Sequence, residues 1–117
     1  MTHPVDVDTL IQLKALIGED LKDILQTFLD IVPTTLNSIK TAIAEENAEA
    51  LEYQAHTLKG SAANIGATTL PGLCLVLESK GKEGVTQGLE PLLNQIENET
   101  DQVMRFLRDA IDHFSQL

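Results

Sequence analysis

Several residue types that particular functions require are scarce in this chain. It has one cysteine, Cys74, so it can form no internal disulfide and no multi-cysteine metal site, and we expect Cys74 to be a small buried hydrophobic residue. It has no tryptophan, one tyrosine and three phenylalanines, which leaves almost no material for stacking nucleobases. The 8 basic residues are outnumbered by 18 acidic ones, and a net charge of −10 disfavours nucleic acids and anionic membrane surfaces as partners.

Long hydrophobic runs are also missing. No apolar run approaches the roughly 20 residues that span a bilayer, and the first residues are polar and acidic, unlike a signal peptide. We therefore expect a cytoplasmic protein without a membrane partner. A length of 117 residues, with 43% of them hydrophobic, fits a single domain over residues 1–117.

Apolar residues recur at intervals of three and four along nearly the whole sequence, and no strand-length window alternates apolar with polar residues. This period predicts helices at about residues 8–17, 19–43, 47–64 and 86–114, and another that opens at 68 or 69. Glycines and charges predict a loop over 79–84. Asn47 is a plausible N-cap of the third helix. The pattern favours an all-α fold, an up-down four-helix bundle with a short additional N-terminal helix.

Two details of the first two helices are open to test. Pro33 should kink or split the second helix, and the spacing of the apolar residues after it favours one kinked helix. The core stripes are expected to include Leu10, Leu13, Leu16 or Ile17 in the first helix and Leu21, Ile24, Leu25 and Phe28 in the second.

The third helix carries the candidate chemistry. Its core stripe consists of Leu51, Ala55, Leu58, Ala62 and Ile65. His56 projects about 140° away from the centre of that stripe and should face solvent. Gly60 and Ala63, four and seven residues later, share this outward face and leave it nearly bare of side chains. A glycine inside a helix costs about 1 kcal/mol relative to alanine, and close approach by another protein would explain it.

Lys59 lies on the shoulder of the same surface. Its ammonium could reach the vicinity of the His56 imidazole and offset the negative charge of a phosphoryl group there. Histidine suits phosphoryl transfer because its neutral ring offers a nucleophilic nitrogen at physiological pH. Glu49 and Glu52 flank the His56 surface and are placed to steer basic rims of a partner.

The segment Ala55-His56-Thr57-Leu58-Lys59-Gly60-Ser61-Ala62-Ala63 resembles the signature of histidine-containing phosphotransfer (HPt) domains from multistep phosphorelays. Further likeness lies in Phe28, Pro33 and Leu36, in Asn64-Ile65-Gly66-Ala67, and in Leu73-Cys74 and Leu77-Glu78. The resemblance therefore extends over essentially the whole chain.

This resemblance implies a four-helix bundle whose exposed histidine, here His56, takes a phosphoryl group from the aspartate of one response-regulator receiver domain and passes it to another. Lys59 would assist the phosphoryl group and Gly60 would admit the receiver, with Ala63, Ser61 and Glu52 in the docking surface. The Mg²⁺ of such systems belongs to the receiver, so we expect no metal or cofactor in this chain. The partners would be receiver domains, a hybrid sensor histidine kinase, or both, and the chain would be a monomer.

The family often places glutamine near the histidine at a position corresponding to Glu78. A carboxylate pointing inward would repel the phosphoryl group, so Glu78 is expected to face water. The sequence leaves open whether the chain is free-standing or a domain of a hybrid kinase.

Other interpretations remain. The chain could instead be a helical adaptor or dimerisation bundle, in which His56 would have no role. This interpretation predicts an exposed apolar patch and no phosphorylation. A histidine-kinase dimerisation domain would need a following ATP-binding domain with glycine-rich boxes, which the sequence lacks, so we expect no autonomous kinase activity. His3, in a terminus expected to be frayed, and His113 are expected to be ordinary surface residues, since the three histidines lack the spacing of a metal set.

Overall fold

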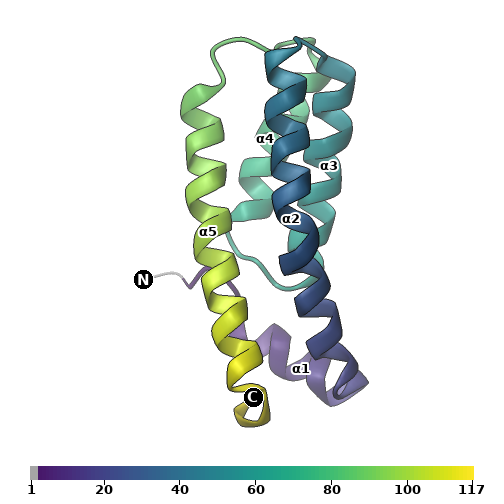
Figure 1. Cartoon of the computed structure of the whole chain (residues 1–117), viewed down its shortest axis with the longest axis vertical. Helices are drawn as coiled ribbons and strands as arrows, with labels where there is room; N and C mark the ends of the chain where they lie inside the picture. Colours follow the sequence, from purple (N-terminus) through teal and green to yellow (C-terminus); the bar gives the residue numbers. More distant parts are fainter. Residues whose placement is uncertain (1–2) are drawn as a thin grey trace.

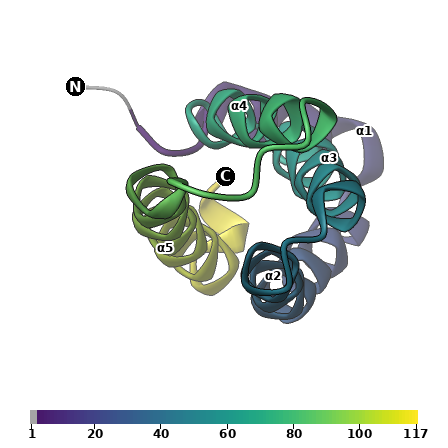
Figure 2. The same ribbon diagram turned by 90° about the horizontal axis from the view of Figure 1, so that it is seen from above.

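The computed structural model describes residues 3–117. These residues form the α-helices α1 (Val7–Ile17), α2 (Asp20–Ala44), α3 (Ala48–Asn64), α4 (Leu70–Lys82) and α5 (Glu90–Asp112), followed by a 3₁₀ turn, Phe114–Gln116. Helices α2 to α5 run alternately up and down along the long axis, and α1 lies across one end (Figure 1). Seen from above, the four long helices surround a common centre (Figure 2). The expected all-α bundle with an additional N-terminal helix is confirmed. No helix within residues 3–117 is long and apolar enough to cross a membrane.

The core is built from one apolar stripe on each helix. Burying a large aliphatic side chain completely contributes roughly 1.5–3 kcal/mol, so this stripe pattern is the main source of stability. The largest fully buried side chains are Leu10, Leu21, Leu25, Ile39, Leu51, Leu58, Ile65, Leu70, Leu77, Ile96 and Leu107.

The core prediction was wrong at three positions. Leu16 is 80% exposed and Ile17 38%, because α1 lies across the bundle end and buries only Leu10 completely. Ile24 is 47% exposed, since it borders a surface groove between α2 and α3 instead of the bundle centre.

Helix α2 continues through Pro33 without interruption, which confirms one helix rather than two. Pro33 is exposed, so its bulky ring lies on the solvent side. The N-cap prediction for α3 is also confirmed, because the Asn47 side chain accepts a hydrogen bond from the Ala50 amide at 3.0 Å. Helix α5 begins later than predicted, after Gly88, whose φ of 73° interrupts a helix.

Helices α3 and α4 approach each other backbone to backbone. Gly81 is buried, and a Cβ atom added there would lie 2.7 Å from the backbone nitrogen of Glu52 and 2.9 Å from the carbonyl oxygen of Ala48. The loop predicted over 79–84 was therefore wrong for its first four residues. Glycine at position 81 permits a tight helix contact within α4, and the chain leaves the helix only afterwards, with Gly84 at a φ of 76°.

The N-terminal segment is attached to the connection between α3 and α4. Val5 is fully buried and forms an isolated antiparallel bridge with Ala67. The Asp6 amide donates to the Gly66 carbonyl at 2.8 Å, and the Thr68 amide donates to the Pro4 carbonyl at 3.0 Å. The hydroxyl of Thr68 also donates a hydrogen bond to the carbonyl of His3, so the expectation of a frayed terminus was wrong from His3 onward.

Candidate functional site

His56 lies in the middle of α3, with its side chain 66% exposed. The neighbouring residues Ala55, Leu58 and Ala62 are buried on the opposite face of the helix. The amphipathic pattern of α3 therefore turns the imidazole outward, and the predicted exposure of His56 is confirmed.

Glu78, in α4, holds both His56 and Lys59. Its Oε2 lies 3.0 Å from Nδ1 of His56, and its Oε1 accepts a hydrogen bond from Nζ of Lys59 at 2.6 Å. The Glu78 side chain is only 7% exposed, against 27% for Lys59. We call these three residues the His56–Glu78–Lys59 cluster. Its carboxylate is concealed between the helices, while its imidazole is open to solvent.

The expectation that Glu78 faces water was wrong. Helix α4 packs on the Lys59 side of α3, and Glu78 continues the buried stripe formed by Leu70, Cys74, Leu77 and Gly81. Burying a carboxylate is costly unless its oxygens are bonded, and here each oxygen has its own partner. The three- and four-residue spacing from Cys74 to Glu78 and on to Gly81 was the signal in the sequence that could have revealed this burial.

The charge state of Glu78 follows from its partners. The hydrogen bond from Lys59 is the largest influence and lowers the pKa of the Glu78 carboxyl below its ordinary value of 4.5; burial opposes this, and the hydrogen bond with His56 adds to it. Glu78 is therefore a carboxylate at neutral pH. Its charge is balanced by the ammonium of Lys59.

Beneath the cluster lies Cys74, which is fully buried as the sequence predicted. Burial raises the pKa of the Cys74 thiol to about 12, a rise that the charge of Lys59 opposes and that of Glu78 reinforces. The thiol therefore stays protonated and does not act as a nucleophile. It packs as an apolar group beneath Glu78.

The face beside His56 is bare. Gly60 is exposed, and apart from its chain neighbours and the adjoining backbone of α3 no atom lies within 4 Å of the position that a Cβ would take there. Ala63 is also exposed. Together they leave open space next to the imidazole, as the sequence predicted; their part in docking stays a prediction.

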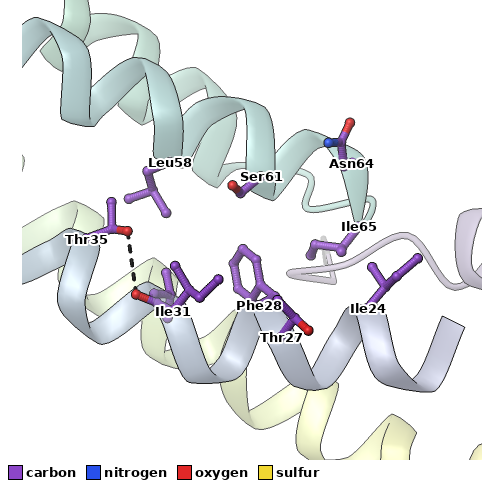
Figure 3. A pocket seen from close by; sticks show the side chains of 10 residues that line it. Ile24, Thr27, Phe28, Ile31, Thr35, Leu58, Ser61, Asn64 and Ile65 are labelled. Atoms are coloured by element: carbon purple, nitrogen blue, oxygen red, sulfur yellow. Dashed lines mark hydrogen bonds between the residues drawn. The ribbon is translucent and has the colours of Figure 1, made fainter. Parts of the chain in front are cut away.

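This bare face leads into an apolar groove between α3 and α2. Around the axis of α3, Gly60 lies about 40° from the direction of His56, Asn64 about 80° and Ser61 about 140°, all in the same sense. Asn64 and Ser61 line the groove. Its volume is about 170 Å³. In Figure 3, Leu58 of α3 and Ile65, which follows α3, point towards the α2 residues Phe28 and Ile31. The lining also includes Ser61 and Asn64 from α3 and Ile24, Thr27, Val32 and Thr35 from α2. The groove, with the half-exposed Ile24 and Ile31 at its edge, was not predicted.

A second depression, which is acidic, lies between α3 and α4 and includes His56 itself. It is lined by Glu49, Glu52, Tyr53, His56, Glu78 and Lys82. The structure thus places Glu52 beside His56, as predicted, and adds Tyr53 and Lys82, which the sequence analysis did not select. His3 and His113 are exposed and lie outside this site.

Comparison with known proteins identifies the family of this chain. Residues 23–114 match the family model of the Hpt domain. The signal transduction histidine-protein kinase BarA of Shigella flexneri is 34% identical over 85 residues, and BarA of Escherichia coli (strain K12) is 33% identical over 85 residues. Each match covers 72% of this chain, and the chain spans only 9% of the length of these curated relatives.

Solved structures agree with this match. Histidine-containing phosphotransfer protein B (HptB) from Pseudomonas aeruginosa PAO1 shares 27% identity and a TM-score of 0.90, with 97% of this chain and 98% of that chain covered. The HPT domain of a sensor hybrid histidine kinase from Shewanella has the same fold, with a TM-score of 0.80 at 24% identity over 98% of this chain and 97% of that chain. The family model spans most of the chain, and the curated relatives match it over 72% of its length, so this chain belongs to the Hpt domain family.

Proposed function

We propose that His56 accepts a phosphoryl group from the aspartyl phosphate of one receiver domain and donates it to the aspartate of another. The single observation that carries this proposal is the geometry of His56: an exposed imidazole, held at Nδ1 by Glu78, beside the open space over Gly60. Membership of the Hpt domain family supports phosphotransfer within a phosphorelay as the activity of this domain.

Positioning and charge neutralisation are what such a transfer requires from this chain. The open face lets the phosphorus atom come in line with the imidazole, and Lys59, still partly exposed, offers positive charge close to the new phosphoryl group. We propose that the acidic pocket and the Mg²⁺ ion that complete the reaction belong to the receiver. This chain would then need no metal, nucleotide or other cofactor of its own.

A receiver would dock over Gly60, Ala63 and Ser61 and extend onto the groove. Gly60 lies between His56 and the groove, so one partner surface can cover both at once. Exposed Ile24 and Ile31 supply apolar contact area, at 47% and 54% exposure. Glu52 and the strongly negative chain would attract basic rims of the partner and speed the encounter.

The curated relatives suggest the setting of this relay. Their printed description, signal transduction histidine-protein kinase, supports a sensor histidine kinase as the partner or the parent of this domain. We propose that the domain works as a monomer in the cytoplasm, since each site it presents is suited to a transient partner and His56 must stay uncovered between encounters.

One observation favours a second candidate function. The exposed isoleucines at the groove are the kind of apolar patch that a helical adaptor or dimerisation bundle would show. Such a protein would bind its partner without becoming phosphorylated, and His56 would be dispensable.

Phosphorylation of the chain by a phosphorylated receiver decides between these functions. We expect His56→Gln to abolish an acid-labile label while the helical circular dichroism spectrum is unchanged. His113→Gln is the matched control, because His113 is another exposed histidine with an acidic neighbour, Asp109, but lies at the end of α5, away from the site, and should label normally. Undiminished labelling of His56→Gln would exclude His56 as the carrier.

A further inference from the structure

A polar depression lies in the same valley between α2 and α3 as the apolar groove. The groove takes its α3 residues from Leu58 onward, after His56, whereas the polar depression takes Ala50 and Gln54, which precede it. Gln54 lies only about 3 Å from His56 along the axis of α3, and about 160° from it around that axis. Ser61 of the groove points to nearly the same side. His56 therefore stands at the level where the two depressions meet.

The chemistry of the valley changes at this level. The polar depression has a volume of about 320 Å³, and its lining consists of hydroxyl, amide and small side chains with one carboxylate, Glu45, at the C-cap of α2. We call it the polar pocket, and its residues are Thr34, Asn37, Ser38, Thr41, Ala42, Glu45, Ala50 and Gln54. In a chain with a net charge of −10 this surface is nearly uncharged. It is therefore unsuited to steering a charged partner from a distance.

The polar side chains of this pocket are free to bond with a partner. On the same two helices, the hydroxyls of Thr27, Thr35 and Thr57 each donate to the backbone carbonyl one turn earlier. Within residues 3–117, by contrast, no side-chain hydrogen bond is formed by five residues of the pocket, Thr34, Asn37, Ser38, Thr41 and Gln54. All five are exposed or half-buried, so they are hydrated in the free protein.

Covering such groups is favourable only when the partner supplies matching hydrogen bonds. A hydroxyl or amide that is buried without a partner loses its bonds to water and gains nothing in return. An apolar groove accepts any apolar surface of fitting shape and discriminates weakly, whereas a hydrogen-bonding site rejects a mismatched partner strongly. The two halves of the valley are thus suited to different tasks, affinity in the groove and selection in the polar pocket.

On the basis of the phosphotransfer function proposed above, we propose that the polar pocket selects among receiver domains. The receiver is the occupant because the pocket begins within one turn of His56 and continues the groove onto which docking extends. An interface of ordinary size, roughly 800 Å² on each partner, is large enough to cover both depressions. A receiver with matching backbone, amide or hydroxyl groups transfers fast, and one with apolar or charged groups there transfers slowly.

The test measures phosphoryl transfer to the chain from a panel of phosphorylated receiver domains. Thr41→Val and Gln54→Met remove hydrogen-bonding groups while nearly preserving side-chain shape at positions that are accessible to solvent. We expect the double variant to lower kcat/KM for the fastest receiver about tenfold, the effect of losing one or two hydrogen bonds. The slowest receivers should change far less, so the ratio between fastest and slowest falls.

Two controls separate selection from a general loss of docking. Gln95→Met makes the same change at an exposed position of α5, outside the valley, and should leave every rate unchanged. Ile31→Ala removes apolar area from the groove and should slow all receivers by a similar factor, which preserves their ratio. Circular dichroism checks that each variant keeps its helices.

Salt distinguishes this mechanism from selection by charge. Screening weakens the attraction between the acidic chain and basic rims of a receiver, so the individual rates should fall as salt is added. The ratio between fastest and slowest receiver should persist, because the polar pocket carries a single charge. A ratio that collapses in salt would overturn the proposal and assign selection to acidic residues such as Glu52.

Three further results would also overturn the selection role. They are equal rates of all receivers with wild type, equal slowing of all receivers by the double variant, and no slowing of any. Each leaves the proposed function standing, provided that His56→Gln fails to label. Full labelling of His56→Gln would instead overturn the function itself, and the selection role with it.

Discussion

Lys59 and Glu78 form the shortest ion pair in the described part of the chain, with Nζ 2.6 Å from Oε1. The lysine that was expected to serve the phosphoryl group is thus already bound to a buried carboxylate before any partner arrives. Its contribution to transfer is made from a fixed position, as one member of the His56–Glu78–Lys59 cluster. Several consequences of this arrangement are open to measurement.

Lys59→Ala should slow phosphoryl transfer without ending it. The ammonium offsets negative charge on the phosphoryl group as it transfers, and a loss of about 1.4 kcal/mol of transition-state stabilisation corresponds to a single-turnover rate roughly tenfold lower, which is the effect that we expect. Lys82→Ala is the matched control, because Lys82 is an exposed lysine near the site that makes no ion pair with any residue from 3 to 117. Equal rates for Lys59→Ala and wild type would show that the ammonium plays no part in transfer.

Acid should weaken the fold through Glu78. Because its pKa in the folded chain is lowered, the unfolded chain binds the proton more tightly, and the carboxylate stabilises the fold above its ordinary value of 4.5. This contribution is lost as the pH falls through the lowered pKa. Urea unfolding at pH 7 and pH 3 should show the advantage of wild type over Glu78→Gln shrinking at the lower pH.

A surface carboxylate offers the comparison for that experiment. Glu97 pairs with Lys40 at 3.1 Å, and both side chains are exposed to solvent. Exposed pairs contribute little, so Glu97→Gln should change the free energy of unfolding far less than Glu78→Gln does at pH 7. A larger effect from Glu97 would contradict the importance given to the buried carboxylate.

Gly60→Glu should weaken receiver binding. The new side chain would occupy the open space beside His56 and add a negative charge where an acidic receiver pocket must approach. Gly72→Glu introduces the same residue at an exposed helix glycine of α4 that also has no neighbour within 4 Å, and it should leave binding unchanged. Calorimetry or fluorescence anisotropy measures the affinity of each variant for the receiver. Equal affinities of Gly60→Glu and Gly72→Glu would contradict the proposed docking face.

Gly81→Ala should destabilise the bundle. Its Cβ would meet the backbone of α3 at 2.7 Å, and forcing such atoms into a packed contact costs typically about 1–3 kcal/mol. All three nearest atoms belong to the backbone and cannot turn aside as a side chain can, so we expect a cost in the upper part of that range, above the roughly 1 kcal/mol gained when alanine replaces glycine in a helix. Gly72→Ala, with open space around it, should show only the gain, so thermal melting temperatures should move in opposite directions.

Helix periodicity predicted most of this fold because each helix buries one continuous apolar stripe. The stripe through Leu51, Leu58 and Ile65 fixed the orientation of α3, and with it the exposure of His56. The side chain of Asn47 marked the start of that helix. Such features are encoded within single helices, and sequence reasoning finds them reliably.

Features that depend on two helices were harder to predict. Glycine and charge suggested a loop at Gly81, because nothing in the local sequence says that the backbone of α3 lies against it. Glu78 was expected in water since a lone carboxylate avoids burial, and only the packing of α4 on α3 brings Lys59 and His56 within reach of it. The groove beside Ile24 likewise exists only between α2 and α3.

The bridge between Val5 and Ala67 links residues far from His56 in sequence to the end of the helix that carries it. Hydrogen bonds from Pro4 and Asp6 hold the turn that joins α3 and α4. At the other end of the same two helices, Gly81 permits their backbones to pack closely. The angle between those helices decides whether the carboxylate reaches the imidazole. Deletion of the first six residues removes no atom of the site, but it would loosen the packing of α3 against α4. The contact between Glu78 and His56 would weaken as a result.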